Sequence, residues 1–164
     1  MTDATDMFAQ YFALDEDAGT LAWIKKPASR ICVGAVAGSV RSDGYGYVHL
    51  LGKRYGLHQV VFAMVHGYIP KEIDHADGNP SNNRPANLRE ATRSQNNCNR
   101  RMQSNNTSGF KGVYLNKRIG RWHARIKVDG RFVSLKYHKT PEAAGEAYLA
   151  AVKTYHGNFA PGAY

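Results

Sequence analysis

The stretch from Ile73 to Asn79 combines side chains suited to hydrolysis of a phosphodiester bond. It reads Ile-Asp-His-Ala-Asp-Gly-Asn. Such hydrolysis requires a base that deprotonates water and a cation that neutralises charge on the phosphate. His75 can be that base, because an imidazole can both take up and release a proton near neutral pH. The carboxylate of Asp74 is the hard oxygen ligand that Mg²⁺ prefers. We therefore expect His75 to be catalytic and Asp74 to bind a metal ion.

Two asparagines further along the chain are candidates for the same site. Adjacent residues of a strand point to opposite faces, so Asp74 and His75 can serve one site only where the strand ends in a loop. A glycine and two prolines follow and predict such a loop. Asn96 can bring its amide oxygen back as a second metal ligand, and Asn87 can hold the loop or orient His75. The alternative is that these asparagines only form turns.

The elements that position this loop are predicted to be short strands and two helices. From Leu21 to Tyr55, runs of Val, Ile and Tyr broken by glycine turns predict a β-meander. Apolar residues at helical spacing after Tyr55 predict a helix that ends at Gly67, with His58 and His66 as ordinary helix residues. Residues 73–99 are expected to form a strand, a long loop, a strand and a short helix capped by Ser94.

The C-terminal third predicts a second small α+β unit. The polar residues 102–107 are interpreted as a linker. A helix is expected to follow the strands, with Thr140 as its N-cap, Pro141 as its first residue and Gly157 at its end. Asp129-Gly130 is typical of a type I′ hairpin turn. The three expected strands are 111–116, 121–128 and 131–137.

Charge is distributed unevenly along the chain. There are 22 Lys and Arg against 13 Asp and Glu, a formal net charge of +9. From Arg84 to Lys139 the only acids are Glu90 and Asp129, against 14 basic side chains. Such a basic segment is typical of a surface that contacts phosphates, although a merely soluble basic surface is the simpler alternative.

Cysteine spacing and hydropathy exclude several classes of protein. Cys32 and Cys98 are far apart and neither belongs to a C-x-x-C pair, so neither a zinc knuckle nor a disulfide framework is expected. No apolar stretch reaches the length of a membrane-spanning helix, and the first residues are acidic where a signal peptide would be basic. We expect a cytoplasmic protein that does not contact membranes.

The loop motif resembles the asparagine-rich, homing branch of the HNH endonucleases over residues 55–99. That resemblance implies a ββα-metal fold with one divalent ion, Mg²⁺ or else Mn²⁺. It also implies a general base at His75, metal ligands at Asp74 and Asn96, and a supporting Asn87. His58 matches an upstream family histidine that is usually followed by Arg, where this chain has Gln59. The matching residues are Asp74-His75, Asp77-Gly78-Asn79, Asn82-Asn83, Asn87-Leu88-Arg89 and Asn96.

Residues 108–159 resemble the AP2 family of DNA-binding domains. The match runs through Phe110-Lys111-Gly112-Val113, Arg121 to Ile126, Thr140 to Ala144 and Ala147-Tyr148. It implies a three-stranded sheet, backed by a helix, that enters the major groove. Leu135-Lys136 departs from the family's Leu-Gly, so base preferences do not transfer. The expected DNA contacts are Arg89, Arg93, Lys111, Arg121, Trp122, Arg125, Lys127 and Arg131, although Trp122 fits the core of the unit equally well.

Together these patterns predict an α+β protein that is a homing-type HNH endonuclease acting on double-stranded DNA. Residues 1–101 form the expected nuclease domain, 102–107 the linker and 108–164 the AP2-like domain. One monomer is expected to cut one strand per binding event, in the cytoplasm of a bacterium or a phage-infected host. A DNA-binding regulator with an inactive HNH fold is the first alternative. An RNA-directed protein is the second, although the sequence shows no evident cluster of exposed aromatics for stacking.

Overall fold

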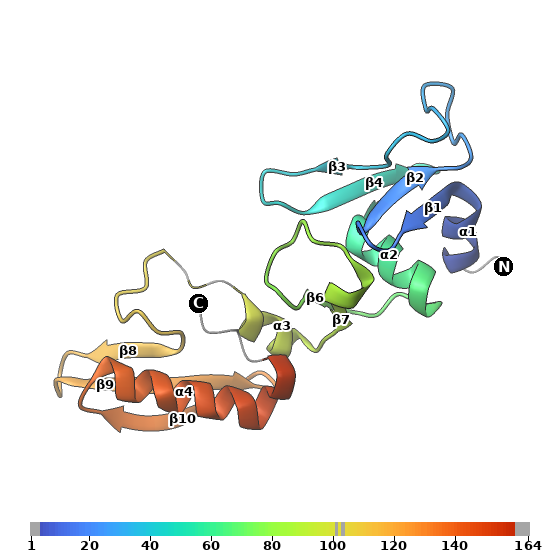
Figure 1. Ribbon diagram of the computed structural model, residues 1–164. Helices are drawn as coiled ribbons and strands as arrows, with labels where there is room; N and C mark the ends of the chain where they lie inside the picture. Colours follow the sequence, from blue (N-terminus) through green and yellow to red (C-terminus); the bar gives the residue numbers. More distant parts are fainter. Residues whose placement is uncertain (1–3, 101, 103, 160–164) are drawn as a thin grey trace. The chain divides into compact units, whose positions relative to one another are not determined.

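The structure, a computed structural model, describes residues 4–100, 102 and 104–159. It divides into two units, Met1–Glu90 and Ala91–Tyr164, which are described separately below (Figure 1). Of the expected linker, residue 103 lies outside the described residues. The domain boundaries expected from the sequence remain predictions. Among the described residues, no helix has both the length and the apolar character needed to cross a membrane.

The first unit consists of short antiparallel strands and two helices. Strands β1 and β2 form one hairpin, and β3, β4 and β5 form a three-stranded sheet in that order. The helix expected after Tyr55 is present and ends at Gly67, whose φ of 80° is the left-handed C-cap. The first helix and first strand were not predicted. The elements are α1 (Ala4–Tyr11), β1 (Phe12–Asp15), β2 (Thr20–Trp23), β3 (Ser39–Val40), β4 (Gly46–Leu50), β5 (Lys53–Gly56), α2 (Leu57–His66), β6 (Ile73–His75) and β7 (Leu88–Glu90).

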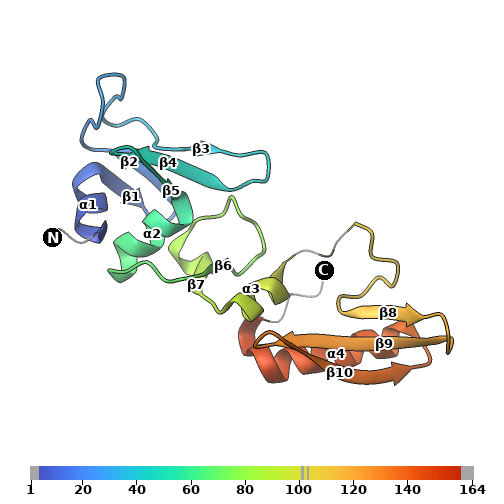
Figure 2. The same cartoon turned by 180° about the vertical axis from the view of Figure 1, so that it is seen from behind.

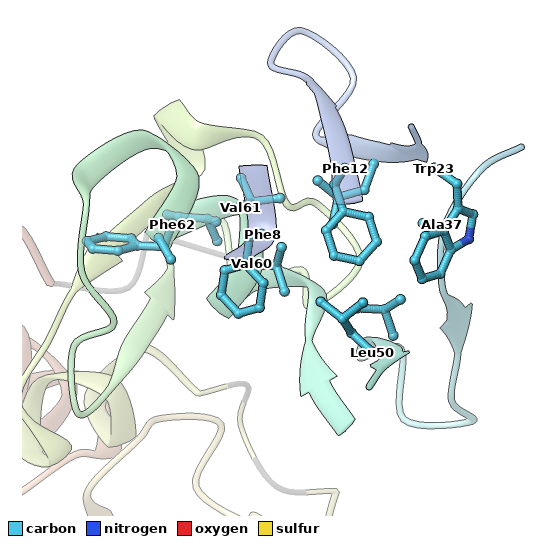
Figure 3. Packing of buried hydrophobic residues seen from close by; sticks show 12 residues of the cluster. Phe8, Phe12, Trp23, Ala37, Leu50, Val60, Val61 and Phe62 are labelled. Carbon is cyan, nitrogen blue, oxygen red and sulfur yellow. The ribbon is translucent and has the colours of Figure 1, made fainter. Parts of the chain in front are cut away.

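The core of the first unit forms where α2 meets the strands (Figure 3). Phe8 and Val60 are fully buried, and Phe12 packs on Trp23 across the first hairpin with ring centroids 4.7 Å apart. Burial of apolar area of this kind is the main favourable contribution to folding. Leu88 of β7 belongs to the same cluster. The core therefore anchors the β6–β7 hairpin that carries Asp74 and His75.

The β6–β7 hairpin confirms the expected order of strand, loop, strand and helix. Its strands pair Asp74 with Arg89 and His75 with Leu88, and the loop between them ends in a 3₁₀ turn, η1 (Pro85–Asn87). The helix that follows is α3 (Arg93–Asn99), which belongs to the second unit.

The cap predicted for α3 was wrong. Ser94 lies inside the helix, and Thr92 caps it: the Thr92 hydroxyl accepts from the backbone N–H of Gln95, whose side chain accepts from the N–H of Thr92.

The second unit is a three-stranded antiparallel sheet with a helix across one face. Strands β8 (Val113–Asn116), β9 (Arg121–Val128) and β10 (Arg131–His138) are ordered with β9 in the centre. Helix α4 (Pro141–His156), followed by the short turn η2 (Gly157–Phe159), packs on one face through Ala144, Tyr148 and Val152 (Figure 1). Mixed α and β architecture is therefore confirmed. Strand β8 begins two residues later than predicted.

The hairpin between β9 and β10 follows the sequence prediction, whereas β10 itself contains an irregularity. Asp129 and Gly130 have φ of 46° and 82°, the positive values that a type I′ turn requires. Further along, the register shifts between Ser134 and Tyr137, and Lys136 takes a φ of 70°. This bulge returns Tyr137 to the side of the sheet that faces away from α4, opposite His123.

Candidate active site

Asp74 and His75 are both buried at the end of β6, with 4% and 5% of their surface exposed. The carboxylate of Asp74 pairs with Arg89 on the neighbouring strand, whose Nε and Nη2 each lie 2.8 Å from Asp74 Oδ2. A buried carboxylate requires such a partner, because burial alone disfavours its charged form. The DNA contact expected of Arg89 stays a prediction, and the structure adds that its guanidinium pairs with the candidate metal ligand.

His75 is held by an asparagine to which the sequence analysis assigned no role. Its Nε2 lies 3.1 Å from Oδ1 of Asn83, which is itself buried. With an amide oxygen as partner, Nε2 carries the proton and the basic lone pair is on Nδ1. Asn83 was visible in the sequence as the second residue of the Asn82-Asn83 pair in the HNH-like motif. Its contact with His75 depends on the fold of the loop and could not be derived from spacing.

Asn87 holds the loop closed rather than contacting His75 in any hydrogen bond the structure describes. Its Oδ1 accepts from the backbone N–H of Asp77 at 3.0 Å, and its Nδ2 donates to Asp77 Oδ1 and to the carbonyl of Asn82. Burial acts to raise the pKa of Asp77, but hydrogen bonds from Asn82, Asn79 and Asn87 outweigh it and lower that pKa. Hydrogen bonds around Asp77 thus hold the loop in one conformation.

Two further aromatic side chains enclose His75. The ring centroids of His58 and Tyr45 lie 5.5 and 5.9 Å from that of His75, and 5.9 Å from each other. Burial, assisted by the proximity of His75, lowers the pKa of His58 to about 4, so its ring is neutral at physiological pH. His58 was expected to be an ordinary helix residue, and its contact with His75 was not predicted. Its match to an upstream family histidine was the available signal.

Turns of the N-terminal strands pack directly on the loop. Gly19, with a φ of 67°, approaches so closely that an added Cβ would lie 2.4 Å from the backbone nitrogen of Arg84. A Cβ on Gly44 would lie 2.9 Å from the ring of Pro80, and the Ser81 hydroxyl donates to the Gly44 carbonyl. Only glycine permits these backbone approaches. The N-terminal hairpins therefore help to fix the position of the loop that carries Asn83.

The remaining candidates of the nuclease motif lie on α3, in the second unit. Arg93 is the first residue of this helix and Asn96 lies one turn later. The structure describes the two units separately, so the pairing of Asn96 with Asp74 at one metal ion stays a prediction. Among the described residues, no group of three or more His, Cys, Asp or Glu side chains is arranged to hold a metal.

The expected DNA contacts of the second unit divide between its two faces. Arg121, Arg125 and Lys127 alternate along β9 and are exposed on the side away from α4. Trp122 packs against the core cluster of the unit. Lys111 donates from Nζ to the carbonyl of Cys98 at 3.1 Å, and burial lowers its pKa.

Arg131 is exposed at the start of β10. Cys98 is buried and Cys32 is exposed, and the two do not form a disulfide.

No cluster of exposed aromatics was evident from the sequence, whereas the structure shows three exposed rings on one sheet. Tyr114, Phe132 and Tyr137 are 39%, 60% and 45% exposed. All three extend from the side of the sheet that α4 leaves open, because they alternate with residues that face the helix. These residues lie on two different strands, and Tyr114 is far from the other two in the sequence, so their proximity could not be predicted from spacing.

Comparison with known proteins adds independent information on this site. A family model described as HNH endonuclease matches residues 55–98. Protein 3.8 of Escherichia phage T7 is 33% identical over 105 residues, which cover 63% of this chain and 86% of that protein. An uncharacterised HNH endonuclease of Acanthamoeba polyphaga mimivirus is 32% identical over 121 residues, covering 72% of this chain and 62% of that protein. No solved structure matches significantly.

The matched segment begins at Tyr55 and contains α2, both strands of the β6–β7 hairpin and most of α3. It therefore includes His58, Asp74, His75 and Asn83, the residues that form the buried site. The family model does not extend to the second unit's sheet. The chain belongs to the family of protein 3.8 of phage T7 and contains an HNH endonuclease domain at residues 55–98.

Proposed function

We propose that the protein is a homing-type endonuclease that requires a divalent metal and hydrolyses phosphodiester bonds in double-stranded DNA. The observation that carries this proposal is the arrangement around His75. Its imidazole is buried beside Asp74 and is oriented through Nε2 by Asn83. Removal of a proton from water requires a base that is held in a fixed orientation, and an imidazole can serve as that base.

In the proposed reaction, Nδ1 of His75 takes a proton from water as the water oxygen bonds to phosphorus. The bond from phosphorus to the leaving sugar oxygen breaks, and that oxygen is protonated from solvent. Asn83 keeps the imidazole in the tautomer that presents Nδ1 as the base, and Arg89 fixes the carboxylate of Asp74. Asn87 maintains the loop on which Asn83 lies.

The donor set proposed for the metal fits a hard divalent cation. Asp74 contributes a carboxylate oxygen and Asn96 an amide oxygen, and Mg²⁺ is commonly held by one or two carboxylates together with waters and substrate phosphates. A closed thiolate and imidazole site of the structural zinc type has no counterpart among the described residues. When bound, Mg²⁺ (or Mn²⁺ in its place) would neutralise charge on the phosphate.

The second unit is proposed to be an AP2-like module that attaches the nuclease to DNA. Three antiparallel strands with α4 on one face support this, as do the exposed cations Arg121, Arg125, Lys127 and Arg131. We infer that one monomer with one general base cuts one strand per binding event.

Plasmid cleavage tests the proposed function. The protein should convert supercoiled plasmid carrying a site to open circles in Mg²⁺ and should be inactive in EDTA. His75→Ala should reduce the rate by about 100-fold or more, while His66→Ala, at an exposed histidine of α2, should cut normally. Cleavage by His75→Ala at the wild-type rate would remove His75 as the base. DNA binding without cleavage in any divalent metal would favour a regulator with an inactive HNH fold.

A further inference from the structure

The open side of the second sheet presents a patch of flat, exposed rings. Tyr114 lies on β8, and Phe132 and Tyr137 lie on β10, all on the face opposite α4. Figure 2 shows the sheet from this side, and no described helix or strand of the second unit covers it. We call Tyr114, His123, Phe132 and Tyr137, with Arg125 and Lys127, the stacking face. Contiguous exposed apolar surface often marks a binding site.

The rings form an ordered row across the three strands. His123, on the central strand, contacts the Tyr114 hydroxyl through Nδ1 and the Ser134 hydroxyl through Nε2. The ring of Tyr137 stacks on His123 with centroids 4.5 Å apart and planes 23° apart. Burial, followed by the charges of Arg125 and His138, lowers the pKa of His123. The middle of the row is thus a ring fixed by its neighbours.

Cations lie among these rings. The Arg125 guanidinium lies 4.3 Å from the centroid of the Phe132 ring and 4.9 Å from that of Tyr114, and the Lys127 ammonium lies 5.6 Å from Phe132. A cation over an aromatic face is stabilised by the ring. Positive charge interleaved with flat rings matches a ligand that alternates phosphates with flat bases.

A hollow adjoins the stacking face at Phe132. Its volume is about 490 Å³, and its lining includes Asn97, Arg100 and Lys111. Amide and cationic groups can hydrogen-bond to base edges and phosphates. Phe132 thus belongs both to the stacking face and to the lining of this hollow, where Asn97 and Arg100 also lie.

We propose that the stacking face binds a single-stranded segment of DNA, with unpaired bases stacked on its rings and phosphates near Arg125 and Lys127. Paired bases in a duplex are already stacked on one another, so their flat faces are not accessible to protein rings. Unpaired bases offer those faces regardless of sequence. The choice of DNA rests on the proposed function. The second unit would then hold unpaired DNA in addition to the duplex that the nuclease is proposed to cut.

Competition binding with the full chain in EDTA tests this proposal, because no cleavage occurs there. A fluorescein-labelled DNA strand of about 12 nucleotides, within the site sizes known for single-strand binders, is the probe for anisotropy. The unlabelled strand should displace it at about ten-fold lower concentration than the same sequence as duplex. Duplex DNA that competes equally well, or RNA of the same sequence that competes better than DNA, would overturn it.

Single substitutions then locate the binding to the rings. Phe132→Leu and Tyr137→Leu should each weaken single-strand affinity by about ten-fold, since each removes one stacking ring, while Phe132→Tyr should retain it. Leu149→Ala, on the exposed side of α4, is the matched control and should bind as wild type. Unchanged affinity in both Leu variants would overturn the proposal. Single-strand binding without plasmid cleavage would instead contradict only the proposed nuclease activity.

Discussion

The loop of residues 76–87 and the stacking face use polar and aromatic side chains in opposite ways. In the loop, Asp77, Asn83 and Asn87 form hydrogen bonds with other groups of the protein. Among these, the contact of Asn83 with Nε2 orients the imidazole of His75. On the stacking face, rings such as Phe132 extend from regular strands and remain exposed. Catalysis depends on exact placement, whereas affinity accumulates from several shallow contacts. A single substitution in the loop should therefore lower the cleavage rate strongly, whereas a single substitution on the stacking face should lower DNA affinity only in part.

The largest expected effect comes from the glycine that supports the loop. Gly19→Ala should lower the free energy of unfolding of the first unit by about 3 kcal/mol, because it combines left-handed backbone strain with a backbone clash at Arg84. Gly34→Ala is the matched control: it has a φ of 84° but open space around the added Cβ, so about 1 kcal/mol of strain alone is expected.

Urea denaturation in a Trp122→Phe background measures the stability of the first unit, because Trp23 is then the only tryptophan. If Gly19→Ala and Gly34→Ala lower the free energy of unfolding equally, the close packing of Gly19 on the loop contributes nothing to stability. Cleavage by Gly19→Ala should also fall, since the Cβ displaces the segment that carries Asn83.

The second prediction concerns pH and His58. Its pKa falls from 6.5 to about 4 on folding, so between these values the unfolded chain binds a proton that the folded protein does not. Stability should therefore decrease as pH falls from about 6.5 toward 4, by about 2 kcal/mol at pH 5 relative to pH 8.

His58→Phe should remove that part of the pH dependence while keeping a ring against Tyr45 and His75. Denaturation midpoints of the two proteins at pH 8 and pH 5 provide the comparison. A variant that loses as much stability at pH 5 as the wild type would show that His58 is not the titrating group.

A smaller effect is expected at Asn83, whose side chain contacts Nε2 of His75, the proposed base. Asn83→Ala should reduce cleavage by about ten-fold with little change in DNA affinity, because the imidazole loses the partner that fixes its tautomer. Asn83→Asp keeps an acceptor at Nε2 and should recover much of the rate. Its carboxylate favours the charged imidazole, so the lower limb of the pH–rate profile should move to higher pH. A profile unchanged in Asn83→Asp would indicate a purely structural role.

Much of the architecture was predictable because local signals were strong. Asp129-Gly130 predicted a hairpin turn, because these residue types adopt positive φ readily. The two ends of α4 were predicted by Thr140 and Gly157, which lie on either side of a stretch with helical apolar periodicity. The first helix and strand were missed, since α1 has only eight residues and no strong cap signal.

The chemistry of the site was predictable at Asp74 and His75 for a similar reason: adjacent residues carry a distinctive pair of functional groups. The partners of these residues were not predictable. Asn83, Arg89 and His58 contact the pair across the strands and the loop, and such contacts depend on tertiary packing rather than on spacing. Trp122 illustrates the same limit: the alternation of β9 was clear, but only the position of α4 shows which side is buried.

The smallest expected effect concerns the bulge that supports the stacking face. Lys136 holds a left-handed conformation, which costs a non-glycine residue about 1–2 kcal/mol, whereas glycine adopts it freely. Part of that gain is offset by the greater freedom of glycine in the unfolded chain, so Lys136→Gly should stabilise the second unit by about 0.5 kcal/mol. Lys136→Val should destabilise it by more, because a β-branched residue is poorly accommodated at positive φ. Denaturation in a Trp23→Phe background, with Trp122 as the probe, measures both.

If the bulge serves mainly to place Tyr137 beside His123, Lys136→Gly should bind single-stranded DNA nearly as tightly as wild type despite losing one charge, while Lys136→Val should bind more weakly. The reverse order of affinities would show that the Lys136 charge, and not the geometry of the bulge, matters for the face.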